Sequence, residues 1–260
     1  MWSELWLKLV DNTGLEDRMV FVLGTWLVHF IAFWGFNGIL TIFYHFNLFP
    51  QYRILKGAMP PKELVNEALF HVIFNHFVTI PIMLYLTYSG FVSFGMQIRA
   101  PLPSIGIVAR DFLVSIVIND TLFYWGHRIM HHASIYKYIH KQHHKFNRSI
   151  GIAAEYAHPL EDLLCNTLPT IGGCLFMGSH VVTLWLWLFL RVIETVDTHS
   201  GYSWPFDPFH LFPSIQGGAE RHDFHHSHNL GCYGSFTIFW DHIMGTDVDF
   251  KKHQQKLKEA

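Results

Sequence analysis

Histidine is the residue type whose number and spacing in this sequence most clearly suggest chemistry. The chain has 260 residues, of which 20 are histidines. His127 and His131 are four residues apart, which places two imidazoles on one face of a helix, one turn apart. Spacings of three and four recur in His140-x-x-His143-His144 and in His222-x-x-His225-His226. Because imidazole binds iron, copper and zinc alike, the three clusters predict a site for two metal ions without naming the metal.

Histidines outside these clusters have a more ordinary interpretation. A lone histidine in an apolar helix is more often a hydrogen-bonded packing residue than a ligand, and we interpret His29, His71 and His76 in this way. His132 and His228 adjoin cluster positions without a helical partner, which disfavours a ligand role. For the clusters themselves the alternative is a chance grouping on a solvated face, which three repeats beside apolar segments disfavour. The histidines left without a role are His45, His180, His210, His242 and His253.

The composition indicates the environment in which these histidines work. Half of the residues are apolar, only 15% are charged, and the mean hydropathy is +0.21, which together indicate a membrane protein. A net charge of −2 gives no reason to expect nucleic acid as a partner. The 3 cysteines form no Cys-x-x-Cys pair, so neither a disulfide framework nor a zinc ribbon is indicated.

Four apolar segments supply the elements that must position the histidines. Residues 19–49 and 68–98 contain no Asp, Glu, Lys or Arg, and each is longer than the ~20 residues that a spanning helix needs. A third segment, 107–124, contains Asp120 and leads directly to His127. The fourth, 163–193, is interrupted by Pro169 and three glycines, and fits either a re-entrant helical hairpin or a kinked span. We therefore predict an all-α, multi-pass transmembrane protein.

Charge near the third segment predicts its orientation. Five basic residues follow that segment immediately, so the positive-inside rule places the histidine clusters and the C-terminus in the cytosol. These residues are Arg128, Lys137, Lys141, Lys145 and Arg148. Lys256 and Lys258 lie five and three positions from the end, a spacing that resembles the dilysine signal for retrieval to the endoplasmic reticulum. The alternative for these two lysines is a solvated basic tail.

Longer motifs around the histidines resemble a known family. The order His-Arg-x-x-His, His-x-x-His-His, His-x-x-His-His resembles the fatty acid hydroxylase and sterol desaturase superfamily of di-iron enzymes. Within it, Ala154-Glu155-Tyr156-Ala157-His158-Pro159-Leu160-Glu161 and the segments 194–202, 221–226 and 240–247 resemble the methylsterol monooxygenase branch. The resemblance runs from the third apolar segment to Asp247. It implies an N-terminal transmembrane region (1–110), a catalytic domain (111–247) and a basic cytosolic tail (248–260).

The resemblance also implies which residues bind metal. The implied ligands are His127, His131, His140, His143, His144, His199, His222, His225 and His226. His158 is a further candidate, although a histidine before proline in a loop can serve structure alone. Asp120 lies two helical turns before His127 and either orients a ligating imidazole or is a polar group satisfied between helices. Other acidic residues that could support ligands are Glu155, Glu161, Glu194 and Asp197.

The activity implied by the resemblance is O2-dependent oxidation of the C-4 methyl group of 4-methyl or 4,4-dimethyl sterols, from methyl to alcohol to aldehyde to carboxylate. It implies two irons, and electrons from NAD(P)H through a reductase and cytochrome b5. The other sterol C-4 demethylation enzymes are then partners. The chain has no Gly-x-Gly-x-x-Gly fingerprint, so we expect no nicotinamide site within it. The alternatives are another lipid oxidation, such as sterol C-5 desaturation or lipid hydroxylation, and a non-enzymatic metal transporter, which the position of the histidines outside the apolar segments disfavours.

Overall fold

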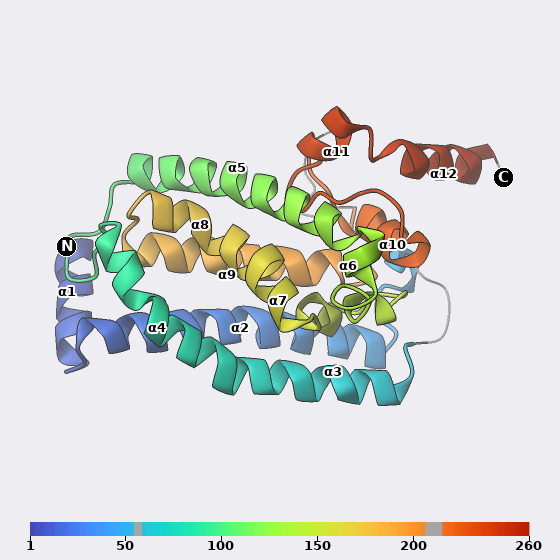
Figure 1. Cartoon of the computed structure of the whole chain (residues 1–260). Helices are drawn as coiled ribbons and strands as arrows, with labels where there is room; N and C mark the ends of the chain where they lie inside the picture. Colours follow the sequence, from blue (N-terminus) through green and yellow to red (C-terminus); the bar gives the residue numbers. More distant parts are fainter. Residues whose placement is uncertain (55–58, 206–214, 260) are drawn as a thin grey trace.

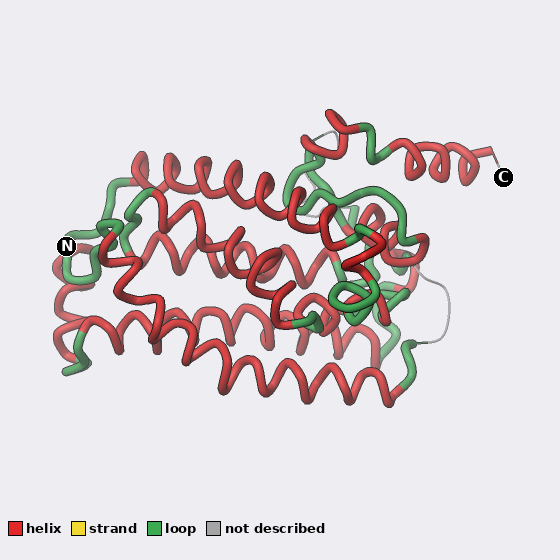
Figure 2. Tube along the Cα trace, viewed as in Figure 1, coloured by secondary structure: helices red, strands yellow, loops and turns green. Residues whose placement is uncertain are grey.

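The computed structural model describes residues 1–54, 59–205 and 215–259, and the described part of the chain is built from helices (Figures 1 and 2). Its β-structure is limited to two isolated bridges, Arg53 with Tyr202 and Gln216 with Thr237. The prediction of an all-α protein is therefore confirmed for these residues.

Two long apolar helices lie side by side along one face of the molecule (Figure 1). A short helix, α1 (Trp2–Asn12), precedes the first of them, α2 (Asp17–His45). The second runs from α3 (Lys62–Phe74) through the π-helical turn η2 (Asn75–Thr79) into α4 (Ile80–Ser93). The π-turn ends two residues before Pro81, whose ring nitrogen carries no hydrogen and cannot donate the hydrogen bond that a regular helix needs there. Among the described residues these are the two helices long and apolar enough to cross a membrane, which indicates a membrane protein.

The third predicted segment forms α5 (Ile105–Met130), which Ser104 caps by accepting a hydrogen bond from the backbone N–H of Ile107. Helix α5 carries charged residues, including Asp111 and Asp120, and it is not one of the two candidate spans. It packs against α8 (Leu168–Phe176) at Gly173, where an added Cβ would lie 2.3 Å from the Cα of Ser115. The two helices approach so closely because this glycine has no side chain.

The fourth segment forms a helical hairpin rather than a single kinked helix. The π-turn η5 (Asp162–Thr167) and α8 lead to a reversal at Gly178, and α9 (Val181–Thr198) returns. Gly178 has φ +57° and an added Cβ there would meet the carbonyl oxygen of Phe94 at 2.3 Å, so the turn requires glycine. Helix α9 then packs along α2.

Short elements gather at the end of the molecule where α5 and α9 finish (Figure 1). Their bounds are η1 (Pro50–Tyr52), α6 (Ala133–Tyr136), η3 (His143–Lys145), η4 (Gly151–Glu155), α7 (Pro159–Glu161), α10 (Ala219–His228), α11 (Phe239–Met244) and α12 (Val248–Glu259). One hydrophobic core, which includes Phe33, Leu40, Phe146 and Val196, joins this end to α2 and α9. A second core, around Phe21, Leu184 and Trp187, holds the opposite end.

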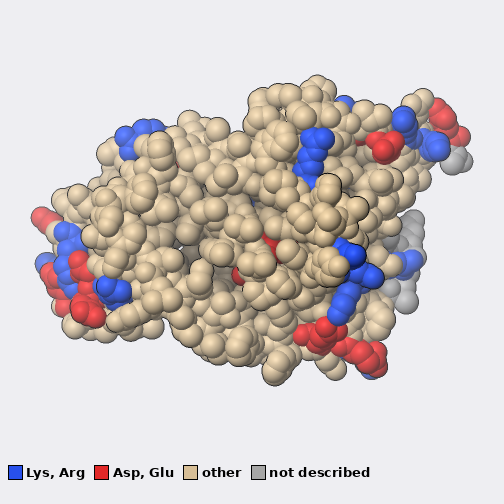
Figure 3. Space-filling view, in the orientation of Figure 1, with Lys and Arg blue, Asp and Glu red and all other residues tan. Residues whose placement is uncertain are grey.

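Charged side chains are distributed unevenly over the surface. On the face drawn in Figure 3, most Lys, Arg, Asp and Glu gather toward the two ends of the long helices, and the surface between them is largely uncharged. Large apolar side chains are exposed along the helices, such as Phe70 on α3, Leu86 on α4 and Leu113 on α5. An uncharged belt between charged ends is what a bilayer requires of the protein it surrounds.

Candidate metal centre

All nine histidines proposed as ligands lie at the crowded end of the molecule, in two groups. The first group contains His127, His131, His140, His144 and His225, and the second contains His143, His199, His222 and His226. In each group one nitrogen of every ring lies within 4.8 Å of the others. The nine residues therefore have the geometry that the ligand assignment needs.

Helix ends and turns supply these rings. His127 lies in the last turn of α5, His131 caps that helix, and His199 caps α9. The third cluster of the sequence lies on α10. The second cluster lies on turns and the 3-10 turn η3 rather than on a regular helix, yet its spacing of four still brings the Nε2 atoms of His140 and His144 to 3.0 Å.

Backbone carbonyl groups hold the outer nitrogens of four rings. Because a carbonyl oxygen only accepts hydrogen bonds, each of these rings carries its proton on Nδ1 and presents an unprotonated Nε2 to the cluster. The bonds are from His127 to Tyr233 at 3.1 Å, His199 to Thr195 at 2.7 Å, His225 to Gly231 at 2.6 Å and His226 to Phe146 at 2.9 Å. The rings are therefore fixed in the tautomer that a metal ligand needs.

The inner nitrogens of the four-histidine group fit a cation between them. Nε2 of His222 lies 2.8 Å from Nε2 of His199 and 3.0 Å from Nε2 of His226. Both neighbours present lone pairs, and a neutral His222 can donate one hydrogen from Nε2 to only one of them. At least one close pair of nitrogens is then left without a hydrogen between them, and a metal ion accepting both lone pairs resolves the conflict.

Burial keeps the rings uncharged. It lowers the pKa of His143 and of His225 to about 4, and lowers the pKa values of His199, His222 and His226 well below the ordinary value. Neutral imidazole is the form that binds a metal, so at neutral pH no proton has to leave these rings first.

One of the acidic residues named from the sequence supports a ligand. An oxygen of Glu161 lies 2.7 Å from Nδ1 of His140, and both groups are buried. Glu194 instead pairs with Arg191 on α9, and Asp197 is buried on the last turn of the same helix. Glu155 binds two histidines that belong to neither group, His29 at 2.9 Å and His76 at 2.6 Å.

Asp120 does not contact an imidazole, so of its two interpretations the structural one holds. Its carboxylate accepts hydrogen bonds from the backbone N–H groups of Phe236 at 3.2 Å and Thr237 at 2.9 Å, and from the side chain of Asn119 at 3.2 Å. The spacing of seven places Asp120 on the His127 face of α5, but the loop around Thr237 covers that position. Asp120 thus anchors the loop to the helix.

His158 lies outside both groups. Its Nδ1 accepts a hydrogen bond from the backbone N–H of Leu160 at 3.2 Å and caps α7, so the histidine before proline serves structure. His132 caps α6 in the same way and is exposed, and His228 stacks on Phe224 with ring centres 4.3 Å apart. His210 lies outside the described residues.

His29, His76 and Glu155 form a third polar cluster, which the sequence did not predict as a group because α2, η2 and η4 are far apart in the chain. Nε1 of Trp34 donates to Nδ1 of His76 at 3.0 Å, so His76 carries its hydrogen on Nε2 and donates it to Glu155. That hydrogen occupies the nitrogen a metal would need. The hydrogen-bonded packing interpretation fits both histidines, and His71 packs edge-on against Tyr156.

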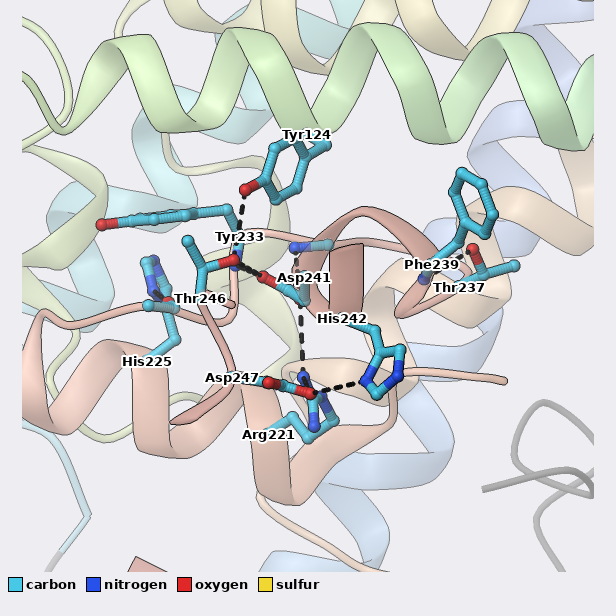
Figure 4. Close-up of polar contacts among 12 residues, drawn as sticks. Tyr124, Arg221, His225, Tyr233, Thr237, Phe239, Asp241, His242, Thr246 and Asp247 are labelled. Atoms are coloured by element: carbon cyan, nitrogen blue, oxygen red, sulfur yellow. Dashed lines mark hydrogen bonds and ion pairs between the residues drawn. The ribbon is translucent and has the colours of Figure 1, made fainter. Parts of the chain in front are cut away.

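The motif Trp-Asp-His-Ile-Met-Gly-Thr-Asp near the C-terminus positions the wall of the first group (Figure 4). Asp241 accepts from the backbone N–H groups of Tyr233 and Gly234, both at 2.9 Å, and from the hydroxyl of Thr246 at 2.7 Å. That hydroxyl is 3.1 Å from the hydroxyl of Tyr124 on α5. Asp241 therefore fixes the loop whose Tyr233 carbonyl holds His127. Sequence reasoning did not find this role, because the partners are backbone groups.

Two cavities adjoin the histidines. A small one of about 20 Å³ lies beside His199 and His222, with Thr195, Thr198 and Arg221 in its wall. It has room for about one water molecule or a comparably small species. A larger cavity of about 510 Å³ opens beside His131 of the first group.

Comparisons with known proteins agree with this geometry. The family model for fatty acid hydroxylase matches residues 112–246. Methylsterol monooxygenase 1 of Rattus norvegicus is 35% identical over 267 residues, which cover 99% of this chain and 87% of the rat protein. Methylsterol monooxygenase 2-2 of Arabidopsis thaliana is 36% identical, covering 98% of this chain and 94% of that protein.

A relative named for another activity is similar to the same degree. Very-long-chain aldehyde decarbonylase GL1-8 of Oryza sativa subsp. indica is 37% identical, covering 92% of this chain and 90% of the rice protein. No solved structure matches the chain. The match over residues 112–246 and the relatives that align over nearly the whole chain show that the protein is an enzyme of the fatty acid hydroxylase family, with histidine clusters typical of di-iron oxidoreductases.

Proposed function

We propose that this enzyme uses O2 to oxidise the C-4 methyl group of 4-methyl or 4,4-dimethyl sterols at two irons held by the nine clustered histidines. The observation that carries the proposal is the convergence of nine neutral imidazoles in two adjoining groups, four of them fixed through Nδ1 by backbone carbonyls. The methylsterol monooxygenases among the relatives, which align over nearly the full chain, support the choice of sterol.

The metal and the protein have different roles in this reaction. Removing hydrogen from an unactivated methyl group requires a stronger oxidant than any side chain provides, and bound iron with O2 supplies it. The first oxidation consumes one O2, two electrons and two protons, and yields the alcohol and one water. The chain's own residues hold the imidazoles neutral, orient them through Nδ1 and exclude bulk water from the buried rings. Two further oxidations of the same carbon lead to aldehyde and carboxylate.

The second candidate function is the removal of the carbonyl carbon from a very-long-chain aldehyde, favoured by the rice relatives at 37% identity. It shares every histidine with the first candidate and differs in the substrate. A metal transporter fits the structure less well, because the two histidine groups lie beyond the helices that are apolar enough to span a membrane.

The proposal includes the setting of the enzyme. We place it in the endoplasmic reticulum membrane as a multi-pass protein, divided into regions 1–110, 111–247 and 248–260, with the histidine face and the C-terminus in the cytosol. Electrons come from NAD(P)H through a separate reductase and cytochrome b5, and other sterol C-4 demethylation enzymes consume the product. Lys256 and Lys258, on the last turn of α12, act as a retrieval signal.

Product analysis separates the two functions. Membranes containing the protein are given NADPH, its reductase and cytochrome b5, together with either 4,4-dimethyl sterol or a very-long-chain aldehyde. Mass spectrometry should find the 4-carboxy sterol and leave the aldehyde unchanged. An aldehyde that loses its carbonyl carbon, with untouched sterol, would replace the first function by the second.

A further inference from the structure

The cavity beside His131 has the size and lining of a lipid site. Its volume of about 510 Å³ lies within the roughly 300–1,000 Å³ that small-molecule sites occupy. Apolar and aromatic side chains dominate the wall, which includes Trp125, Ile129, Ile135, Tyr233 and Met244. Helices α5, α6 and α11 contribute four of these residues and the loop before α11 contributes Tyr233, so the cavity lies where these elements meet.

His131 is the point at which the metal centre meets this cavity. Eight of the nine clustered histidines are at most 9% exposed, and His131 is the most exposed of the nine. Its Nε2 lies 3.1 Å from Nε2 of His225, inside the five-histidine group, while the ring also lines the cavity. A molecule in the cavity therefore lies next to the group without crossing any other wall.

An apolar face of α5 leads to the cavity. Leu113 and Val117 are 67% and 65% exposed, and Trp125 and Ile129 are also exposed. Successive residues of this set are four or eight positions apart, so each lies near the next, and together they form an exposed apolar stripe that winds partly around the helix toward the cavity. Phe239 and Ile243 of α11 extend the exposed apolar surface beside it. In a protein with two candidate spanning helices, such a surface fits the hydrocarbon of a bilayer.

The cavity wall also contains polar side chains, among them Arg128 and His132. The guanidinium of Arg128 lies over the ring of Trp125 at 5.6 Å and donates to the hydroxyl of Tyr124 at 3.2 Å. His132 is exposed beside it. This arrangement suits a ligand with a large hydrocarbon body and one small polar group.

We propose that this cavity binds the lipid substrate, which comes from the bilayer along the exposed face of α5 and rests its hydrocarbon body on Trp125, Ile129 and Met244. The carbon to be oxidised then lies beside His131. The inference rests on the proposed function, because it takes a sterol as the lipid. Filling the cavity should weaken substrate binding and leave the metal centre intact.

The first test is photolabelling of the full-length protein in lipid nanodiscs with a 4,4-dimethyl sterol that carries a diazirine. Peptide mapping should place the label within residues 125–135 or on Met244, and excess unmodified sterol should prevent it. Label confined to α2, α3 or α4 would overturn the proposal. This test needs no altered protein, so it does not depend on the folding of a variant.

The second test fills the cavity from two elements. Ile129→Trp and Met244→Trp should each raise KM for the sterol by about tenfold or more, with unchanged iron content, since the larger ring occupies the space of the ligand. The matched control is Leu86→Trp, an exposed position on α4, which should leave KM unchanged. Equal KM values in all three variants would contradict the proposal.

The outcomes separate this inference from the proposed function. If the cavity is labelled but the sterol is not oxidised, the cavity is a lipid site and the proposed sterol oxidation is wrong. If the sterol is oxidised and the label lies elsewhere, the assignment of the cavity as the substrate site is wrong and the proposed function stands.

Discussion

Glu161→Gln tests whether a buried carboxylate strengthens the metal centre. Glu161 is an acidic side chain named from the sequence that contacts a clustered histidine, with 2.7 Å between its Oε1 and Nδ1 of His140. The substitution keeps an oxygen acceptor of nearly the same shape and removes the negative charge. A carboxylate in this position raises the basicity of the imidazole and fixes its orientation.

The expected loss of metal affinity follows from the position of the contact between Glu161 and His140. Both side chains are buried, so solvent does not screen the interaction between the carboxylate and the ring. Loss of such a support lowers metal affinity by about 10- to 100-fold, which corresponds to about 1.4 to 2.7 kcal/mol. Burial raises the pKa of Glu161 well above its ordinary value, and a nearby cation opposes that shift, so the carboxylate is expected to ionise as metal binds.

Competition with a chelator on the purified protein measures the affinity. The matched control is Glu155→Gln, because Glu155 is a buried carboxylate bound to His29 and His76, outside both groups. We expect weaker iron binding in Glu161→Gln and unchanged binding in Glu155→Gln. Unchanged affinity in the first variant, or an equal loss in both, would refute the support that we assign to Glu161.

Three further predictions follow from the site and the tail. His225→Ala removes a ligand without touching the apolar helices, so oxidation should be lost while the protein stays in the membrane fraction; normal turnover would remove the third cluster from the site. In the metal-free protein, stability should fall as pH drops from 6.5 toward 4, because the unfolded chain binds protons in that range and buried His143 and His225, with pKa values of about 4, do not. The loss reaches about 3 kcal/mol for each ring and is measured as denaturation midpoint against pH, where a flat profile would contradict it. Replacing Lys256 and Lys258 with Ser should release the protein to the Golgi or cell surface, and unchanged residence would show that another feature retains it.

The sequence predicted the histidines of the metal centre well, because their signal is local. Spacings of three and four bring rings together on helices and also on the turns around His140, so eight positions followed from pattern together with the family resemblance. His199 followed from the resemblance alone, since no neighbouring histidine precedes or follows it at helical spacing. The structure places it 2.8 Å from His222 by the packing of α9 against α10.

What the sequence missed depends on contacts between distant segments. The groups that accept hydrogen bonds from Nδ1 of the ligand histidines are mostly backbone carbonyls, such as those of Tyr233 and Gly231. Every residue has a backbone carbonyl, so the sequence cannot show which ones do this. The sequence placed Asp120 on the same helix face as His127. Its hydrogen-bond partners, however, are backbone N–H groups of the loop that packs on that face, such as that of Thr237. Residues 163–193 form a hairpin because of the close packing at Gly173 and the reversal at Gly178, which pair distant segments.

The number of irons in the active, purified protein tests the central claim most directly. Nine imidazoles in two groups exceed what one ion accepts, since a single ion rarely takes more than about six ligands. Metal analysis of the same preparation that oxidises the substrate should find two irons per chain, and activity should be lost and regained as iron is removed and restored. One zinc per chain, with activity that does not depend on iron, would contradict the account.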